Sequence, residues 1–285
     1  MRLTVAVVRP SPTMAARLAN PVADAFTRCF AKRGWKVEQH STRIEGEPDL
    51  VAGYGWRDVM ADAWSRWPDR VLHVDGAFWS RSREVKLGMG GRWAPYSGRE
   101  FDGRRLAAHR VKIAPSRPPG LRVLVCGMSA KAAISWGLDP EQWERDAVAT
   151  LVGAGADVTY RPKPRWSEAR AIDGAGFEDG SRHAINDSLA RVDAVATHHS
   201  NVAVDAIAAG LPIYTEIGLA KAMSVCGIET LPGSSAHDHA ERERFLHEVA
   251  WHQWTLEELA AGVWMKAPAP LSGNLAFTHS SKEIP

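Results

Sequence analysis

The 285-residue chain contains no run of about eighteen apolar residues, so no transmembrane helix is expected. It contains only three cysteines, Cys29, Cys126 and Cys226, and their odd number and wide spacing argue against a disulfide framework. We expect reduced thiols, buried among apolar neighbours, in a cytoplasm. The apolar stretch Leu3–Val8 is more typical of a first strand than of a signal peptide.

Several motifs of nucleotide and metal chemistry are also missing. No Gly-x-Gly-x-x-Gly follows a predicted strand, which argues against a nicotinamide or flavin enzyme. No Walker A or Gly-x-Ser-x-Gly pattern is present, which argues against a P-loop kinase and a serine hydrolase. His-Glu-x-x-His, Cys-x-x-Cys, EF-hand and Asp-x-Asp patterns are absent, so we expect neither a metal site nor a cofactor.

The chain does contain a segment over 193–215 that is typical of a buried strand, a polar loop, a short helix and a second strand. The loop His198–Asn201 lies where the strand's carboxyl end meets the helix, and ligands of open α/β sheets bind at such junctions. Ser200 is a favourable N-cap, and the amide groups behind it attract an anion. Asn201 and Asp205 share one helix face, and Gly210 can end the helix in a left-handed turn.

Two more polar loops follow predicted strands of the same half, at Gly127–Lys131 and Arg161–Arg165. Parallel strands present their carboxyl ends on one side, so the three loops should converge into a diphosphate site. The alternatives are that the Arg161–Arg165 cations pair with acids such as Glu168, and that the loop histidines only bond to backbone. The candidate donor-binding residues are Gly127, Ser129, Lys131, Arg161, Lys163, His198, His199, Ser200, Asn201 and Asp205.

The order of predicted elements indicates an α/β fold with two Rossmann-like domains facing a Trp-rich cleft. Residues 1–75 predict a β-α-β-β-α-β order, and 80–110 a functional loop or small hairpin. A strand is expected over Leu106–Ile113, a Pro-rich linker over 114–120, and a helix over Ser181–Val192. The expected domains are 1–117, which would bind an acceptor, and 118–265, which would bind a nucleotide sugar, followed by a tail at 266–285.

Basic charge is concentrated between Ser80 and Arg117, where ten Lys/Arg and three Asp/Glu give +7, against −5 for the other residues. Aromatic side chains are interleaved with it, a pattern typical of polyanion and nucleic-acid binding. The alternative is a solvated loop whose arginines pair with acids elsewhere. The candidate acceptor-binding residues are Trp79, Arg81, Arg83, Arg92, Trp93, Arg104 and Arg105.

The pattern Ser200-Asn-Val-Ala-Val-Asp205-Ala, followed by Gly210-Leu-Pro, resembles the donor-site helix of GT-B glycosyltransferases. The resemblance implies that Ser200 and Asn201 contact phosphate or sugar and that Asp205 binds hydroxyl groups. It covers roughly residues 121–262. The larger GT-B families have a pair of Glu residues spaced by eight, and this chain lacks the pair. Only Asp205 is present in that region, and Glu216 is too far along the chain to replace the missing Glu.

Sugar transfer to a hydroxyl needs a base, and Asp75, at the end of a predicted strand before a glycine turn, is the candidate catalytic residue. The alternative is that Asp75 only caps that turn.

The leading hypothesis is a metal-independent glycosyltransferase, resembling phage enzymes that modify 5-hydroxymethylcytosine in double-stranded DNA. The resemblance implies a UDP-sugar donor and, for a phage protein, a location in the cytoplasm of a bacterial host. The competing hypotheses are transfer to a surface polysaccharide or lipid-linked glycan, and a non-catalytic nucleotide-sugar or nucleic-acid binding protein.

Overall fold

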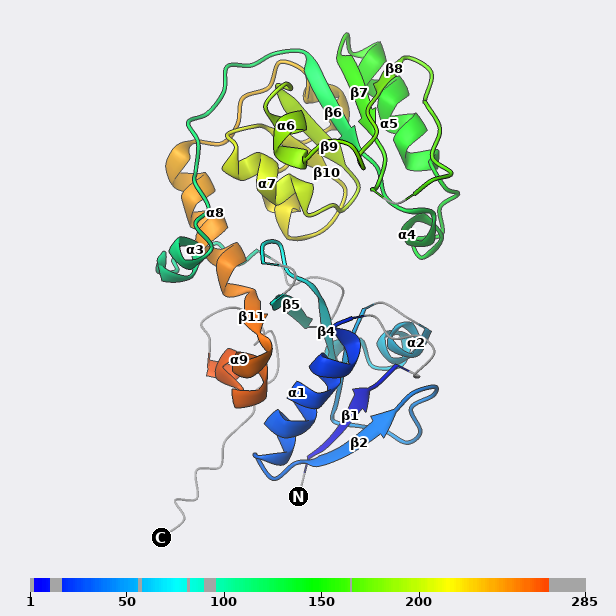
Figure 1. The fold of residues 1–285 in the computed structure, drawn as a ribbon, viewed down its shortest axis with the longest axis vertical. Coiled ribbons are helices and arrows are strands. Elements are labelled where there is room, and N and C mark those ends of the chain that lie inside the picture. The colour runs from blue at the N-terminus through cyan, green and yellow to red at the C-terminus, as the bar shows by residue number, and fades with distance from the viewer. Residues whose placement is uncertain are drawn as a thin grey trace. The chain divides into compact units, whose positions relative to one another are not determined.

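A computed structural model describes residues 3–10, 17–55, 58–80, 83–89, 96–164 and 166–266. The fold is α/β with mainly parallel sheets, as the sequence predicts (Figure 1). The described chain divides into two compact units. Unit 1 holds the residues up to Ser97 and from Glu248 onward, and unit 2 holds Gly98–His247.

Unit 1 is built on a six-stranded sheet with the order β11-β5-β4-β3-β1-β2. Strands β1 to β4 are parallel, and β5 pairs antiparallel with both β4 and β11. The expected β-α-β-β-α-β order is therefore confirmed. The elements are β1 (Thr4–Val8), α1 (Ala19–Ala31), β2 (Lys36–His40), β3 (Leu50–Tyr54), α2 (Asp58–Arg66), β4 (Val71–Gly76), β5 (Glu84–Met89), β11 (Gln253–Thr255) and α9 (Leu256–Ala261).

The core of unit 1 forms where α1 and α9 pack on the sheet. The apolar stripe of α1, including Phe26 and Phe30, meets Trp254 and Leu259 from the C-terminal segment. The sequence Thr255-Leu-Glu-Glu258 has the pattern of a capping box, and Thr255 and Glu258 form one at the start of α9.

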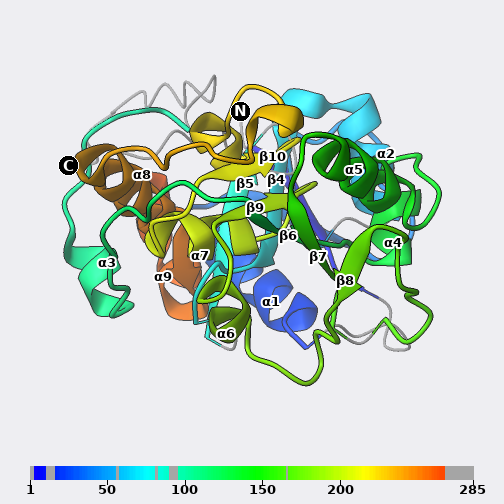
Figure 2. The same cartoon turned by 90° about the horizontal axis from the view of Figure 1, so that it is seen from above.

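Unit 2 is built on a five-stranded parallel sheet with the order β10-β9-β6-β7-β8. Helix α5 lies on one face of the sheet, and α6 and α7 lie on the other (Figures 1 and 2). The elements are α3 (Arg104–Ala108), β6 (Arg122–Cys126), α4 (Ala130–Ile134), α5 (Gln142–Gly153), β7 (Asp157–Arg161), β8 (Ala175–Phe177), α6 (Ile185–Leu189), β9 (Ala194–Thr197), α7 (Val202–Ala208) and β10 (Ile213–Thr215), with 3-10 turns at Leu219–Met223 and Ile228–Thr230. Helix α8 (His239–Trp251) begins in unit 2, and its residues from Glu248 onward belong to unit 1.

Three local expectations are wrong. The segment Leu106–Ile113 is not a strand. Its first residues belong to α3, and Arg110 has a positive φ of 55°, which is not a strand conformation. The helix expected over Ser181–Val192 is reduced to the short α6, since turns occupy its first residues. Cys226 is exposed, whereas Cys29 and Cys126 are buried as expected.

The division into units differs from the expected boundary at residue 117. Ala114 N–H donates to the Ala208 carbonyl (2.8 Å) and Arg117 N–H to the Gly210 carbonyl (3.0 Å), so the Pro-rich segment belongs to unit 2. Residues from Glu248 onward belong to unit 1, because β11 pairs with β5 and α9 packs on α1. None of the helices described by the structure is long and apolar enough to cross a membrane.

Candidate functional site at the carboxyl edge of the unit 2 sheet

The strand order of unit 2 creates a topological switch point between β6 and β9. In chain order this sheet is 3-2-1-4-5, counted from β8 to β10, so the connections leave β6 and β9 toward opposite faces. Ligands of open α/β sheets bind in the crevice outside the carboxyl ends at such a point. Cys126 pairs in register with Thr197, so the loops after β6 and β9 begin side by side.

The loop after β6 carries three of the candidate donor-binding residues. Gly127 N–H donates to the Arg161 carbonyl (2.9 Å), and a Cβ on Gly127 would crowd Tyr160 and Glu144. Ser129 is the N-cap of α4, and its Oγ accepts from Ala132 N–H (3.3 Å). Lys131 is exposed on α4. The close packing of Tyr160 and Glu144 therefore favours a glycine at position 127.

A buried carboxyl group supports this loop from below. Glu144, in the first turn of α5, is fully buried, and its Oε1 accepts from Met128 N–H at 2.7 Å. Its Oε2 has no hydrogen-bond partner among the residues that the structure describes. Burial raises the pKa of Glu144 above its ordinary value of 4.5, and the nearby Glu141 carboxylate adds to this.

This raised pKa predicts a pH-dependent stability. Below pH 4.5 both states hold the proton; above it the folded chain binds a proton that the unfolded chain has released, so stability falls as pH rises. Glu144→Gln keeps an acceptor for Met128 and has no proton to lose. We expect urea denaturation to show its stability advantage over wild type growing from pH 4.5 to 7.5. Exposed Glu168→Gln is the control, and an advantage independent of pH would contradict the assignment.

The loop after β9 places two histidines in contact. His198 Nδ1 lies 2.8 Å from His199 Nδ1, so one ring donates and the other accepts, and the pair holds at most one proton between these atoms. The His198 carbonyl accepts from Thr215 Oγ1 (2.9 Å) and Ile217 N–H (3.2 Å). The backbone of this loop is therefore fixed by β10 while the imidazoles remain at the sheet edge.

Helix α7 begins one residue later than the sequence suggests. Asn201 is its N-cap residue, and Ser200 lies just before it, with Oγ accepting from Val202 N–H (3.3 Å). Asp205 lies on α7, half-buried, and is close enough to Cys126 to raise the pKa of that thiol. Gly210 ends α7 with a φ of +78°, as expected, and a Cβ there would overlap the Pro115 carbonyl.

Aromatic side chains that the sequence did not single out surround the histidines. Trp136 lies 5.7 Å from His198 and 6.0 Å from His199 between ring centroids. Trp143, in the first turn of α5, meets His198 edge-on at 5.8 Å. We call Trp136, Trp143, His198 and His199 the aromatic box. In the sequence Trp136 and Trp143 stand seven positions apart, and nothing near them indicates that they meet the loop after β9.

Arg161 does not present its guanidinium at this edge. It is 5% exposed and forms an ion pair with Glu178, and it donates to Ser188 Oγ (2.9 Å) and to the Gly180 (3.1 Å) and His183 (2.7 Å) carbonyls. The alternative of pairing with an acid therefore describes Arg161, and Glu178 takes the place expected for Glu168. We leave Arg161 out of the donor site.

Lys163 is exposed, and its charge lowers the pKa of Cys126, so it lies near the end of β6. Burial has the larger effect and raises the pKa of the Cys126 thiol to about 12, which keeps it protonated. Arg165 lies outside the described residues.

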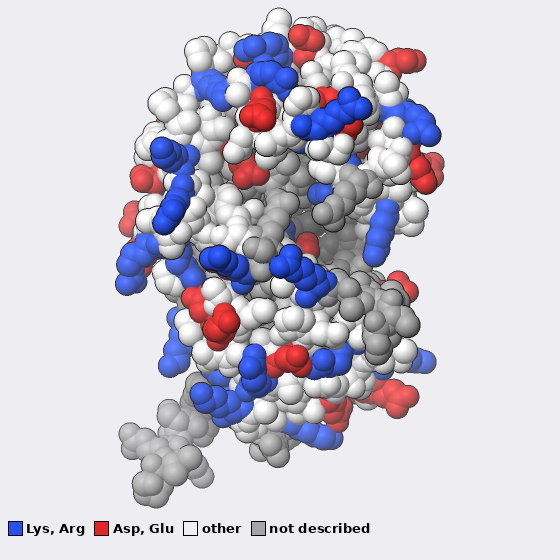
Figure 3. Space-filling model, viewed as in Figure 1, with Lys and Arg blue, Asp and Glu red and all other residues white. Residues whose placement is uncertain are grey.

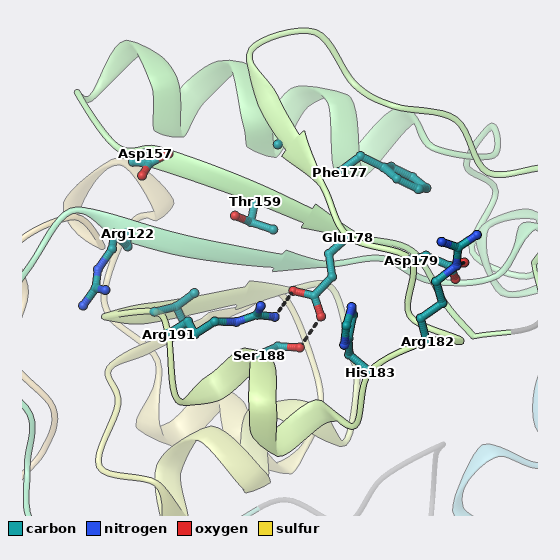
Figure 4. Close-up of a pocket in the computed structure, with 12 residues that line it drawn as sticks. Arg122, Asp157, Thr159, Phe177, Glu178, Asp179, Arg182, His183, Ser188 and Arg191 are labelled. Carbon is teal, nitrogen blue, oxygen red and sulfur yellow. Dashed lines mark hydrogen bonds and ion pairs between the residues drawn. The ribbon is translucent and has the colours of Figure 1, made fainter.

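A cavity of about 710 Å³ lies on the sheet face opposite α5, beside α6 (Figure 4). Thr159 and Glu178 line it together with Arg182 and Arg191. Several of its charged groups pair with one another: Glu178 accepts from Arg191 (2.9 Å) and from Ser188, and Asp179 pairs with Arg182 (3.0 Å). These charges are therefore already engaged within the protein.

Asp75 ends β4 in unit 1, and its Oδ1 accepts from Gly76 N–H (2.7 Å), so it does cap the turn. It pairs in register with Lys86, which is 7% exposed and lies 4.6 Å from the Phe78 ring centroid. Trp79 N–H donates to Gln253 Oε1 (2.8 Å), which fixes the loop after β4. Asp75 is half-buried, and the oxygen that caps the turn is Oδ1.

The basic segment does not form one continuous element. Arg83 lies in unit 1 and is exposed, whereas Arg104 and Arg105 lie on α3 in unit 2. Arg104 is held by Asp102 (2.8 Å), and this contact also lowers the pKa of the Asp102 carboxyl group. Arg117 caps α6 by donating to the Leu189 (2.7 Å) and Val192 (3.1 Å) carbonyls.

On the face drawn in Figure 3, basic and acidic side chains are interspersed. Arg81, Arg92 and Trp93 lie outside the described residues. Within the described ranges, no group of three His, Cys, Asp or Glu side chains is placed to hold a metal ion.

No protein-family model matches the chain, and no curated protein matches it. The chain is similar in fold to solved structures that include two of KpsC from Thermosulfurimonas dismutans. The β-Kdo 2,4-transferase aligns with a TM-score of 0.52 at 14% identity, over 87% of this chain and 91% of its own. The β-Kdo 2,7-transferase aligns with a TM-score of 0.52 at 12% identity, over 93% of this chain and 100% of its own. At these identities the likeness shows a common fold.

Proposed function

We propose that this chain is a glycosyltransferase that binds a nucleotide-activated sugar at the carboxyl edge of the unit 2 sheet. The observation that carries the proposal is the switch point, where strand order sets the Gly127–Lys131 and His198–Asn201 loops side by side. The two KpsC structures that are similar in fold are named as Kdo transferases, which is the same class of reaction.

The leaving phosphate would be stabilised by groups of the protein. The side chain of Ser200 and the imidazole of the half-buried His199 carry hydrogen-bond donors beside the start of α7. Lys131 and Lys163 supply positive charge from the two loops beside it. Because no Asp-x-Asp motif is present, we propose that transfer does not depend on a metal.

For the acceptor we favour a hydroxyl group of a glycan, with Asp75 as the base. Of the eight described Lys and Arg residues between Ser80 and Arg117, Lys86 is buried, Arg104 is paired with Asp102 and Arg117 caps α6, so these three are less available to phosphates. The second candidate is 5-hydroxymethylcytosine in double-stranded DNA, with UDP-sugar as donor. The net charge of +7 between Ser80 and Arg117 is the observation that favours it.

Donor binding is tested first by thermal unfolding with UDP, CDP, CMP and their sugar conjugates. A nucleotide that binds only the folded chain stabilises it by roughly 2.7 kcal/mol at a hundredfold excess over its Kd, and the shift grows with concentration. Absence of a concentration-dependent shift with every nucleotide in this panel would count against the proposal.

The acceptor is tested by transfer of radiolabelled sugar from the stabilising donor. Transfer to oligosaccharides that changes little between 50 and 200 mM salt is expected for a glycan acceptor. Transfer to hydroxymethylated duplex DNA that falls steeply over the same range would support the second candidate instead.

A further inference from the structure

Glu216 is brought to the donor site by the pairing of the last two strands of unit 2. The register places Thr215 opposite Thr197, so Glu216 and His198 occupy equivalent positions just beyond the sheet edge. The Ile217 N–H, one residue further, donates to the His198 carbonyl (3.2 Å). The sequence indicates that Glu216 is too far along the chain to replace the missing Glu of the larger GT-B families, and the pairing of β10 with β9 places it at the same sheet edge by another route.

The Glu216 carboxylate is anchored through one oxygen only. Its Oε1 accepts from Trp143 Nε1 (3.1 Å) and from the Tyr214 hydroxyl (2.8 Å). Burial raises the pKa of Tyr214 to about 12, with the Glu216 carboxylate adding to the effect, so this hydroxyl remains a donor at neutral pH. Two donors on one oxygen fix the orientation of the carboxylate.

The other oxygen is presented outward. Glu216 is half-buried, and its Oε2 accepts no hydrogen bond from any residue in the described ranges. Lys221 Nζ lies 5.0 Å from the ring centroid of Tyr214, and no ion pair joins Glu216 to Lys221 or to another described cation. A fixed acceptor with an open oxygen is suited to a ligand that carries a hydrogen-bond donor.

The surroundings of this oxygen are aromatic. Trp143, which anchors Oε1, also contacts His198 of the aromatic box, at 5.8 Å between ring centroids. A planar ligand group stacked in the box would therefore lie beside the Glu216 carboxylate. The same tryptophan links the stacking surface and the acceptor.

We propose that Glu216 is a ligand-binding residue that accepts a hydrogen bond, through Oε2, from a hydroxyl or amino group of the nucleotide sugar. The proposal rests on the function proposed above, because the ligand is the donor of that reaction. A site with a fixed acceptor discriminates strongly against an analogue that lacks the matching donor group. Glu216 would therefore determine which nucleotide or sugar is accepted.

Glu216→Gln tests this directly. Glutamine keeps the side-chain shape and can still accept from Trp143 and Tyr214 through Oε1, but it presents an NH₂ donor where the carboxylate presents Oε2. We expect the Kd of the best-binding nucleotide, measured by calorimetry, to increase roughly ten- to a hundredfold, the loss of a hydrogen bond to a charged group. Glu229→Gln removes the same charge from an exposed position of unit 2 and is expected to leave the Kd unchanged.

Matched ligands identify the group that Glu216 binds. CMP against UMP compares an amino group with a carbonyl on the base, CMP against its 2′-deoxy analogue tests the ribose hydroxyl, and UDP-glucose against UDP tests the sugar. The preference that Glu216→Gln abolishes locates the hydrogen bond. Unchanged affinity in Glu216→Gln, with wild type binding normally, would overturn this inference and leave the proposed function standing. Failure of wild type to bind any of these nucleotides would overturn both.

Discussion

Replacing Asp75 with asparagine is expected to lower the rate of sugar transfer by roughly 10²–10⁴-fold, the usual effect of removing a general base. The reason is chemical: the amide oxygen of the asparagine would still accept from Gly76 N–H, as Asp75 Oδ1 does at 2.7 Å, but an amide cannot take a proton from the acceptor hydroxyl. The turn after β4 should therefore keep its conformation. Single-turnover measurement with saturating donor separates this loss from any change in binding.

Two controls make this result specific. Asp69→Asn changes the same residue type at an exposed position of unit 1 and is expected to leave both rate and stability unchanged. Nucleotide binding by Asp75→Asn should equal that of wild type, because the donor loops belong to unit 2. A turnover number within twofold of wild type would show that Asp75 only caps its turn.

The same variant separates an enzyme from a non-catalytic binding protein. A binding protein would have no transfer rate to lose, and Asp75→Asn would leave its nucleotide affinity unchanged. An enzyme would keep its affinity and lose turnover. In Asp75→Asn, Lys86 remains opposite position 75 on β5, so the substitution changes only the carboxylate.

The sequence predicts those parts of the site that depend on local chain geometry. Gly210 has the positive φ expected of a helix stop, and Thr255 and Glu258 form a capping box, because both motifs are completed within a few residues. The segment 193–215 forms the strand, loop, helix and strand that its hydrophobic pattern indicates. The hydrophobic pattern does not indicate which strands are neighbours. The structure shows that the end of β6 lies beside the end of β9.

Contacts between distant segments could not be predicted in this way. Glu216 meets Trp143 across 73 positions of sequence, and nothing local to either residue indicates the other. The short strands β8 and β11 were missed because three residues are too few to show an alternating pattern. Arg161 was taken for a phosphate ligand because its partner Glu178 follows a strand that the sequence did not reveal.

Replacing Arg161 with methionine is expected to lower the free energy of unfolding by about 3–5 kcal/mol, the usual effect of removing one partner of a buried ion pair. Arg161 is 5% exposed and the side chain of Glu178 is 12% exposed. The substitution would therefore remove the more buried of the two arginines that pair with Glu178. The carbonyl groups of Gly180 and His183 would also lose their donor. Urea denaturation monitored by tryptophan fluorescence measures the change.

Arg191 offers a matched control on the same carboxylate. It pairs with Glu178 Oε2 at 2.9 Å but is 58% exposed, so Arg191→Met is expected to cost at most about 1 kcal/mol. Combining Arg161→Met with Glu178→Leu should recover part of the loss, because an apolar pair leaves no buried charge unpaired. Nucleotide affinity of the folded Arg161→Met protein is expected to match wild type, and a loss of affinity with little loss of stability would return Arg161 to the donor site.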